Sequence, residues 1–123
     1  MIIGVVNASH EATIRLVVRG ASGQEYEIEA IIDTGFTGFL TLPPALIASL
    51  GLAWRGLEQV GLGDGSPQLF DVYAATVIWN GQARTVEIDA ADTDPLVGMG
   101  LIYGYELRIQ VINGGTVTIE VLP

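Results

Sequence analysis

The tripeptide Asp33-Thr34-Gly35 is the part of the sequence best suited to chemistry. It follows the apolar pair Ile31-Ile32, which predicts a carboxylate at the end of a strand that enters the core. Such a carboxylate is unfavourable unless it is hydrogen-bonded or has a chemical role. Gly35 permits a tight turn that brings backbone N–H groups to it, and the Thr34 hydroxyl can tie the loop to a neighbouring backbone. The pattern indicates either a reactive carboxylate or an acidic residue that only stabilises a turn.

The elements that must position this loop are mostly strands. Alternating, β-branched-rich segments on either side of Gly20-Ala21-Ser22-Gly23 predict a hairpin over residues 12–32, whose second strand leads into Asp33. Asn80-Gly81 is a strong two-residue hairpin signal. Other turns are expected at 63–66 and 113–115. Further strands are expected at 39–42, 57–62, 68–80, 82–89, 106–112 and 116–122.

Two segments break the strand pattern. Pro43–Leu52 has prolines at its start, helix formers inside and Gly51 near its end, which predicts a short helix. Residues 96–104 suggest a strand end followed by a helical turn, although three glycines weaken that pattern. The sequence therefore predicts an all-β fold with one or two short helices.

Composition limits the possible functions. The chain has 123 residues, of which 50% are hydrophobic and 15% charged, so we expect one folded domain over 1–123. A net charge of -9 disfavours nucleic acid and membrane surfaces as partners. Without cysteine there is no thiol nucleophile, disulfide or thiolate metal site. The sequence shows neither a secretory signal nor an apolar run that could span a bilayer, so we expect a soluble cytoplasmic protein.

The order of these features resembles the retropepsin-like (clan AA) aspartic proteases, in particular their small bacterial single-domain members. Asp33-Thr34-Gly35 is followed by the apolar segment 39–42 and then by the expected helix. Leu96-Val97-Gly98 is similar to the family's second hydrophobic-hydrophobic-glycine element, which packs behind the catalytic loop. Gly63-Asp64-Gly65-Ser66 is similar to the tip of a flap hairpin. The resemblance implies a closed β-barrel over nearly the whole chain.

The resemblance also implies a reaction. Members of the family use two carboxylates that share one proton, because like charges about 3 Å apart do not both ionise readily. This chain has one such motif, since Asp92-Thr93-Asp94 lacks the glycine. The resemblance therefore implies a half-site monomer, a homodimer with Asp33 from each subunit, and a peptide or protein substrate. Thr34 would bond across the dimer, residues 63–66 would cover the substrate, and no metal or cofactor would be needed.

Three residues depart from the viral pattern. Phe36 replaces a small residue after the tripeptide, and Met99 stands where the viral enzymes have an arginine. Asp64 at the expected flap tip could repel acidic peptides. Phe36, Met99 and the shortness of the expected flap are the reasons for a second hypothesis, a dimeric binding or scaffolding domain with little or no turnover. A third is an acidic β-barrel interaction module in which the tripeptide is coincidental.

Other candidate sites have less support. Gly61–Gly65 lacks the lysine and the following helix of a phosphate-binding loop. The acids Glu87, Asp89, Asp92 and Asp94 miss the EF-hand spacing and are typical of a solvated acidic loop. His10 is the single histidine and lies in an expected loop, so a Ser-His-Asp triad has no basis.

Overall fold

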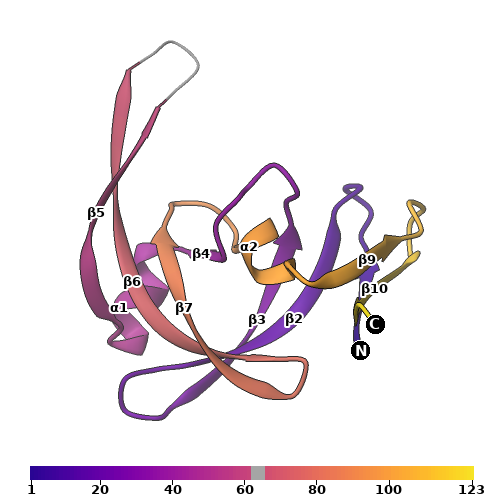
Figure 1. The fold of residues 1–123 in the computed structure, drawn as a ribbon, viewed down its shortest axis with the longest axis horizontal. Coiled ribbons are helices and arrows are strands. Elements are labelled where there is room, and N and C mark those ends of the chain that lie inside the picture. The colour runs from indigo at the N-terminus through magenta and orange to yellow at the C-terminus, as the bar shows by residue number, and fades with distance from the viewer. Residues whose placement is uncertain (62–65) are drawn as a thin grey trace.

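Ten strands and two short helices make up the part of the chain that the computed structural model describes, residues 1–61 and 66–123 (Figure 1). The helices are α1, Pro44–Leu50, and α2, Met99–Ile102. The strands are β1 Ile2–Val6, β2 Ala12–Arg19, β3 Glu25–Ile32, β4 Leu40–Leu42, β5 Ala53–Gly61, β6 Pro67–Trp79, β7 Gln82–Ala90, β8 Leu96–Val97, β9 Tyr105–Ile109 and β10 Thr116–Val121.

The strands form one sheet that closes on itself. Their order is β5-β6-β7-β4-β8-β3-β2-β1-β10-β9, and β6 also pairs with β2. That extra antiparallel pairing, with Val18 opposite Val77, joins β2, β3, β8, β4, β7 and β6 into a ring. The expected closed, all-β architecture with short helices is thereby confirmed.

The ring encloses an apolar core. On β2, Ile14, Leu16 and Val18 alternate with more exposed residues and are buried, as expected for a strand with one face toward the interior. Other strands and both helices add to the same cluster, including Leu40, Leu42, Leu50, Val77, Ile88, Val97, Leu101 and Ile119. This core supports the loops at the strand ends, including the loop that begins at Asp33.

Several local predictions agree with the structure. The hairpin over 12–32 consists of β2 and β3. Asn80 and Gly81 have φ values of 50° and 80°, the left-handed pair that a two-residue hairpin turn requires. Helix α1 begins with Pro44 in its first turn and ends at Gly51, which is left-handed with a φ of 62°.

The largest differences from the predicted strand boundaries concern β1, β5 and β9. Strand β1 was not expected, and it pairs with both β2 and β10. Strand β5 begins at Ala53, four residues earlier than predicted, and its register shifts between Trp54 and Gly56. Strand β9 ends at Ile109 instead of continuing to 112. The chain termini lie near each other on the side of the molecule formed by β9 and β10 (Figure 1).

Candidate active-site cleft

The loop after β3 is closed by hydrogen bonds to Asp33. The backbone N–H of Gly35 donates to Asp33 Oδ1 at 2.9 Å, and the N–H of Phe36 donates to the Asp33 carbonyl at 3.1 Å. The N–H of Asp33 itself donates to the carbonyl of Val97 at 2.9 Å. The Asp33 residue is half-buried, and its loop is tied to β8.

Strand β8 lies between the two segments that flank this loop. It pairs in parallel with β3, with Val97 opposite Ile32, and it pairs antiparallel with β4, with Val97 also opposite Leu40. The buried hydroxyl of Thr41 accepts a hydrogen bond from the N–H of Leu96 at 2.9 Å. Leu96, Val97 and Gly98 therefore lie directly beside the Asp33 loop.

The segments 36–39 and 98–100 bond to each other along their length. Gly98 N–H donates to the carbonyl of Phe39 at 3.0 Å, Met99 N–H to that of Phe36 at 2.8 Å, and Gly100 N–H to that of Gly38 at 2.9 Å. No side chain fits where they meet, since a Cβ on Gly98 would overlap the carbonyl oxygen of Gly38. The glycine of the hydrophobic-hydrophobic-glycine element is thus required by a close backbone approach.

Phe36 packs over the glycines of this junction. A Cβ on Gly38 would lie 2.5 Å from the Phe36 ring, and one on Gly98 would lie 2.6 Å from it. The ring therefore fills the space that two missing side chains leave, and it also lines the neighbouring cleft. Met99, in contrast, is 45% exposed.

A cleft of about 950 Å³ begins at this loop. Gly35 to Phe39 form one wall, and residues of β5, β6, β7 and the loop after β7 complete it. Its size is typical of a binding site for a small molecule or a stretch of peptide. The charged residues that line it are Glu58, Asp71, Glu87, Asp89 and Asp92.

The protein alters the ionisation of Asp89, one of these acids. Burial raises the pKa of its carboxyl group from 3.8 to about 6, and the negative charges of Glu58 and Glu87 add to the rise. An ionised Asp89 is thus held next to two other carboxylates on the wall of the cleft. The spacing of the acids predicts a solvated acidic loop for Glu87 and Asp89, but Asp89 is half-buried in β7. Their spacing of two residues, which puts both on one face of a strand, was the available signal.

The structure brings together six of the residues singled out from the sequence: Asp33, Thr34, Gly35, Leu96, Val97 and Gly98. Thr34 faces a different hollow of about 250 Å³, which it lines together with His10, Ile109 and Val111. The remaining candidates are the four residues of the expected flap tip. Ser66 is exposed just before β6, and Gly63, Asp64 and Gly65 lie outside the described residues.

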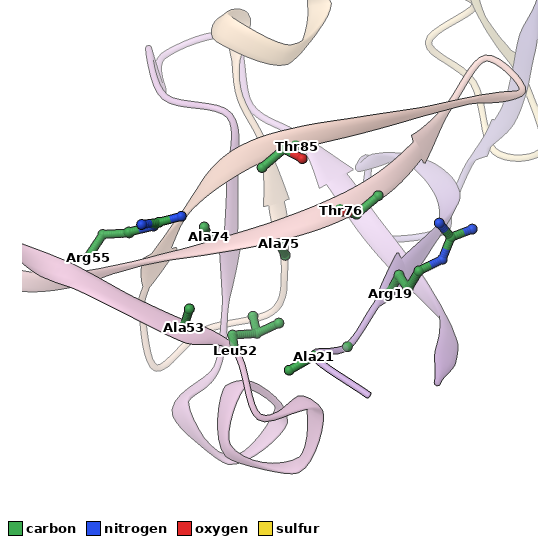
Figure 2. Close-up of a pocket in the computed structure, with 10 residues that line it drawn as sticks. Arg19, Ala21, Leu52, Ala53, Arg55, Ala74, Ala75, Thr76 and Thr85 are labelled. Carbon is green, nitrogen blue, oxygen red and sulfur yellow. The ribbon is translucent and has the colours of Figure 1, made fainter. Parts of the chain in front are cut away.

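A third cavity, of about 290 Å³, contains none of the predicted site residues. Alanines from several elements and the side chains of Arg19 and Arg55 surround it (Figure 2).

Within residues 1–61 and 66–123, no three His, Asp or Glu side chains are grouped closely enough to hold a metal ion. Neither helix in that part of the chain is long and apolar enough to cross a membrane.

The fold matches those of solved aspartic proteases. A retropepsin-like aspartic protease from Rickettsia conorii superimposes with a TM-score of 0.63 at 15% identity, over 99% of this chain and 91% of that one. EIAV protease in complex with the inhibitor HBY-793 superimposes with a TM-score of 0.55 at 17% identity, over 78% of this chain and 88% of that one. The chain has the retropepsin-like fold. Neither the protein-family models nor the curated protein sequences gave a match.

Within the retropepsin-like fold, the hydrogen bonds described above fix the position of the Asp33 loop. Two strands hold its ends, a second glycine-containing segment packs behind it, and a cleft opens on one side. The Asp33 side chain is thus held in a loop whose next residues, from Gly35 onward, line a cleft large enough for a substrate.

Proposed function

We propose that the protein is an aspartic endopeptidase that works as a homodimer, with Asp33 of each protomer at a shared site. The observation that carries the proposal is the position of Asp33 in a loop that is fixed to β8 and whose residues from Gly35 onward line the 950 Å³ cleft. The retropepsin-like fold supports it, since the solved proteins of this fold named above are proteases.

The reaction requires two carboxyl groups, and each chain supplies one. Across a two-fold axis the two Asp33 side chains would share one proton and hold a water molecule between them. The ionised carboxylate takes a proton from the water as its oxygen attacks the peptide carbonyl, and the protonated carboxyl donates to the carbonyl oxygen. Collapse of the resulting diol with proton transfer to nitrogen releases the amine. This route needs no metal or cofactor.

The face next to Thr34 is the proposed contact with the second protomer. Thr34 lines a hollow together with Ile109 and Val111, and Val111 is 72% exposed. Apolar side chains are exposed on the neighbouring segments as well, and burying them would stabilise a dimer by removing apolar surface from water. They include Ile3, Val5, Ile112, Val121 and Leu122.

The decisive experiment replaces Asp33 by Asn and digests a broad peptide library from acidic to neutral pH. We expect the wild-type protein to cleave peptides and to be blocked by a statine-type inhibitor, and Asp33→Asn to lose cleavage while the dimer stays folded. Asp94→Asn is the matched control, because it removes the same charge from an exposed loop outside the cleft. Undiminished cleavage by Asp33→Asn would exclude Asp33 from the mechanism. A wild-type dimer that yields no product would instead favour a binding domain.

A further inference from the structure

The charge of the cleft has a single sign. The acids Glu58, Asp71, Glu87, Asp89 and Asp92 line it, and no arginine or histidine of the described residues does so. Asp71 accepts a hydrogen bond from the indole N–H of Trp54 at 3.0 Å. No ion pair or hydrogen bond joins a described residue to the side chain of Glu58, Glu87 or Asp89.

The protein's own cations are placed elsewhere. The chain has no lysine, and three of its five arginines pair with glutamates outside the cleft. Arg84 donates to the carbonyl of Leu101 at 3.2 Å and lies over the ring of Phe39. Arg55 lines the separate 290 Å³ cavity (Figure 2). Nothing in the described part of the chain therefore neutralises the carboxylates of the cleft.

The backbone presents these carboxylates to the cleft. Glu87 and Asp89 are two residues apart on β7, while Ile88 between them is fully buried in the core. Glu58 belongs to β5, on the other side of β6, and its charge acts on Asp89. A Cβ on Gly38 would lie 3.2 Å from Asp89 Oδ2, so the glycine leaves this carboxylate uncovered beside the Asp33 loop.

We propose that the cleft selects peptides with an arginine or lysine side chain near the bond that is cut, and that Asp89 and Glu58 determine this preference. The proposal rests on the proposed function and specifies its substrate class. A cationic side chain would supply the positive charge that the cleft lacks, whereas an acidic one would be repelled by three carboxylates. A guanidinium could also donate two hydrogen bonds to Asp89.

The two-fold symmetry of the proposed dimer adds a further expectation. Each protomer contributes the same carboxylates, so they recur on both sides of the shared site. A substrate that lies extended through the dimer would meet one acidic group before the cut bond and one after it. The preference for a cationic side chain should therefore occur on both sides of that bond.

The test is run at neutral pH, where Asp89 is ionised. It uses peptide pairs that differ only by arginine or citrulline at one position, and this position is moved residue by residue along both sides of a cleaved bond. Citrulline keeps the shape of arginine without its charge. We expect the wild-type dimer to prefer arginine by roughly fivefold in kcat/KM at the favoured positions, the size of a partly solvated ion pair. The double variant Asp89→Asn/Glu58→Gln should cleave both peptides of a pair equally. Asp94→Asn/Glu29→Gln is the matched control, since it removes an aspartate and a glutamate charge from outside the cleft.

The outcomes separate this inference from the proposed function. Equal cleavage of arginine and citrulline peptides by the wild-type protein overturns the inference, and so does an arginine preference that persists in the double variant. Neither outcome contradicts the proposed protease function. Where the wild-type protein cleaves no peptide, the proposed function fails. Fluorescence anisotropy then measures the binding of the same peptide pairs, carrying a fluorescent label, to the Asp33→Asn variant. This measurement tests the inference independently of cleavage. Tighter binding of arginine peptides that is lost when Asp89→Asn and Glu58→Gln are added to Asp33→Asn supports the inference, and equal binding overturns it.

Discussion

The α-carbon of Gly98 lies so close to the carbonyl oxygen of Gly38 that a methyl group at position 98 would overlap it. The backbone of Gly98 has a φ of -99° and a ψ of 175°, which alanine adopts without strain. The requirement for glycine at this position is thus one of space. It holds the segment behind the Asp33 loop at the distance that its three backbone hydrogen bonds need.

Gly98→Ala is expected to lower the free energy of unfolding by about 3 kcal/mol, because the obstructing atoms belong to backbone and a ring instead of a flexible side chain. Urea unfolding followed by circular dichroism measures the effect. Gly104→Ala is the control, since position 104 has open space but a φ of 89°. It isolates the cost of a left-handed backbone, about 1 kcal/mol. An equal loss in both variants would contradict the crowding at Gly98.

The Thr41 hydroxyl provides a second test of how β8 is held. Thr41 is 5% exposed, and its hydroxyl accepts the N–H of Leu96. Thr41→Val keeps the shape of the side chain but leaves that buried N–H without a partner, so we expect a loss of about 2 kcal/mol in the free energy of unfolding. Thr41→Ser retains the acceptor and should lose less, about 1 kcal/mol. Thermal unfolding of both variants checks the order, and a serine variant that is the less stable of the two would contradict it.

The separate strands, turns and helix, and the position of the Asp33 loop at a strand end, were predictable because they depend on local signals, whereas the closed barrel was implied only by the resemblance. The alternation of residues 12–32, the Asn80-Gly81 turn and the Pro43–Leu52 pattern each specify an element without knowledge of its partners. The resemblance then supplied the pairing of Leu96-Val97-Gly98 with the loop. The structure explains why that pairing needs glycine. The reason is a close backbone contact between Gly98 and Gly38, which are far apart in sequence.

The charge of the cleft and strand β1 were not predictable in the same way. Glu58 and Asp89 belong to different strands, and the fold that brings their charges together is not visible in the spacing of either. The segment 2–6 contains a glycine and lacks alternation of apolar and polar residues. Its strand conformation depends on pairing with β10, more than a hundred residues later.

The apolar face beside Thr34 yields a test of the proposed dimer. Val111→Asp places a charge on a side chain that is 72% exposed in the protomer, so the fold of the protomer should be little affected. In a dimer that buries this face, the charge would be desolvated, and we expect the dissociation constant to rise at least about tenfold. Sedimentation velocity over a range of concentrations measures it. Tyr26→Asp, on β3 at the far end of its hairpin, is the control. A wild-type protein that stays monomeric at high concentration would contradict the dimer.

Asp89 provides the last prediction, which concerns stability and pH. Its pKa is about 6 in the folded protein and 3.8 without the fold, so the folded state binds the proton more tightly. Between these two values, stability falls as the pH rises, and the full penalty is present above pH 6. Asp89→Asn removes the penalty and should raise the free energy of unfolding at neutral pH by about 1 kcal/mol, a figure reduced because water screens a half-exposed group.

The pH dependence distinguishes this cause from a general effect of removing one acid. The gain from Asp89→Asn should be present at neutral pH and disappear as the pH falls toward 3.8. Glu58→Gln and Glu87→Gln should each give a smaller gain at neutral pH. Burial is the largest cause of the raised pKa of Asp89, and the charges of Glu58 and Glu87 are smaller causes. Urea unfolding at a series of pH values measures all three variants beside Glu29→Gln. A constant gain across the series would show that ionised Asp89 is not what destabilises the fold.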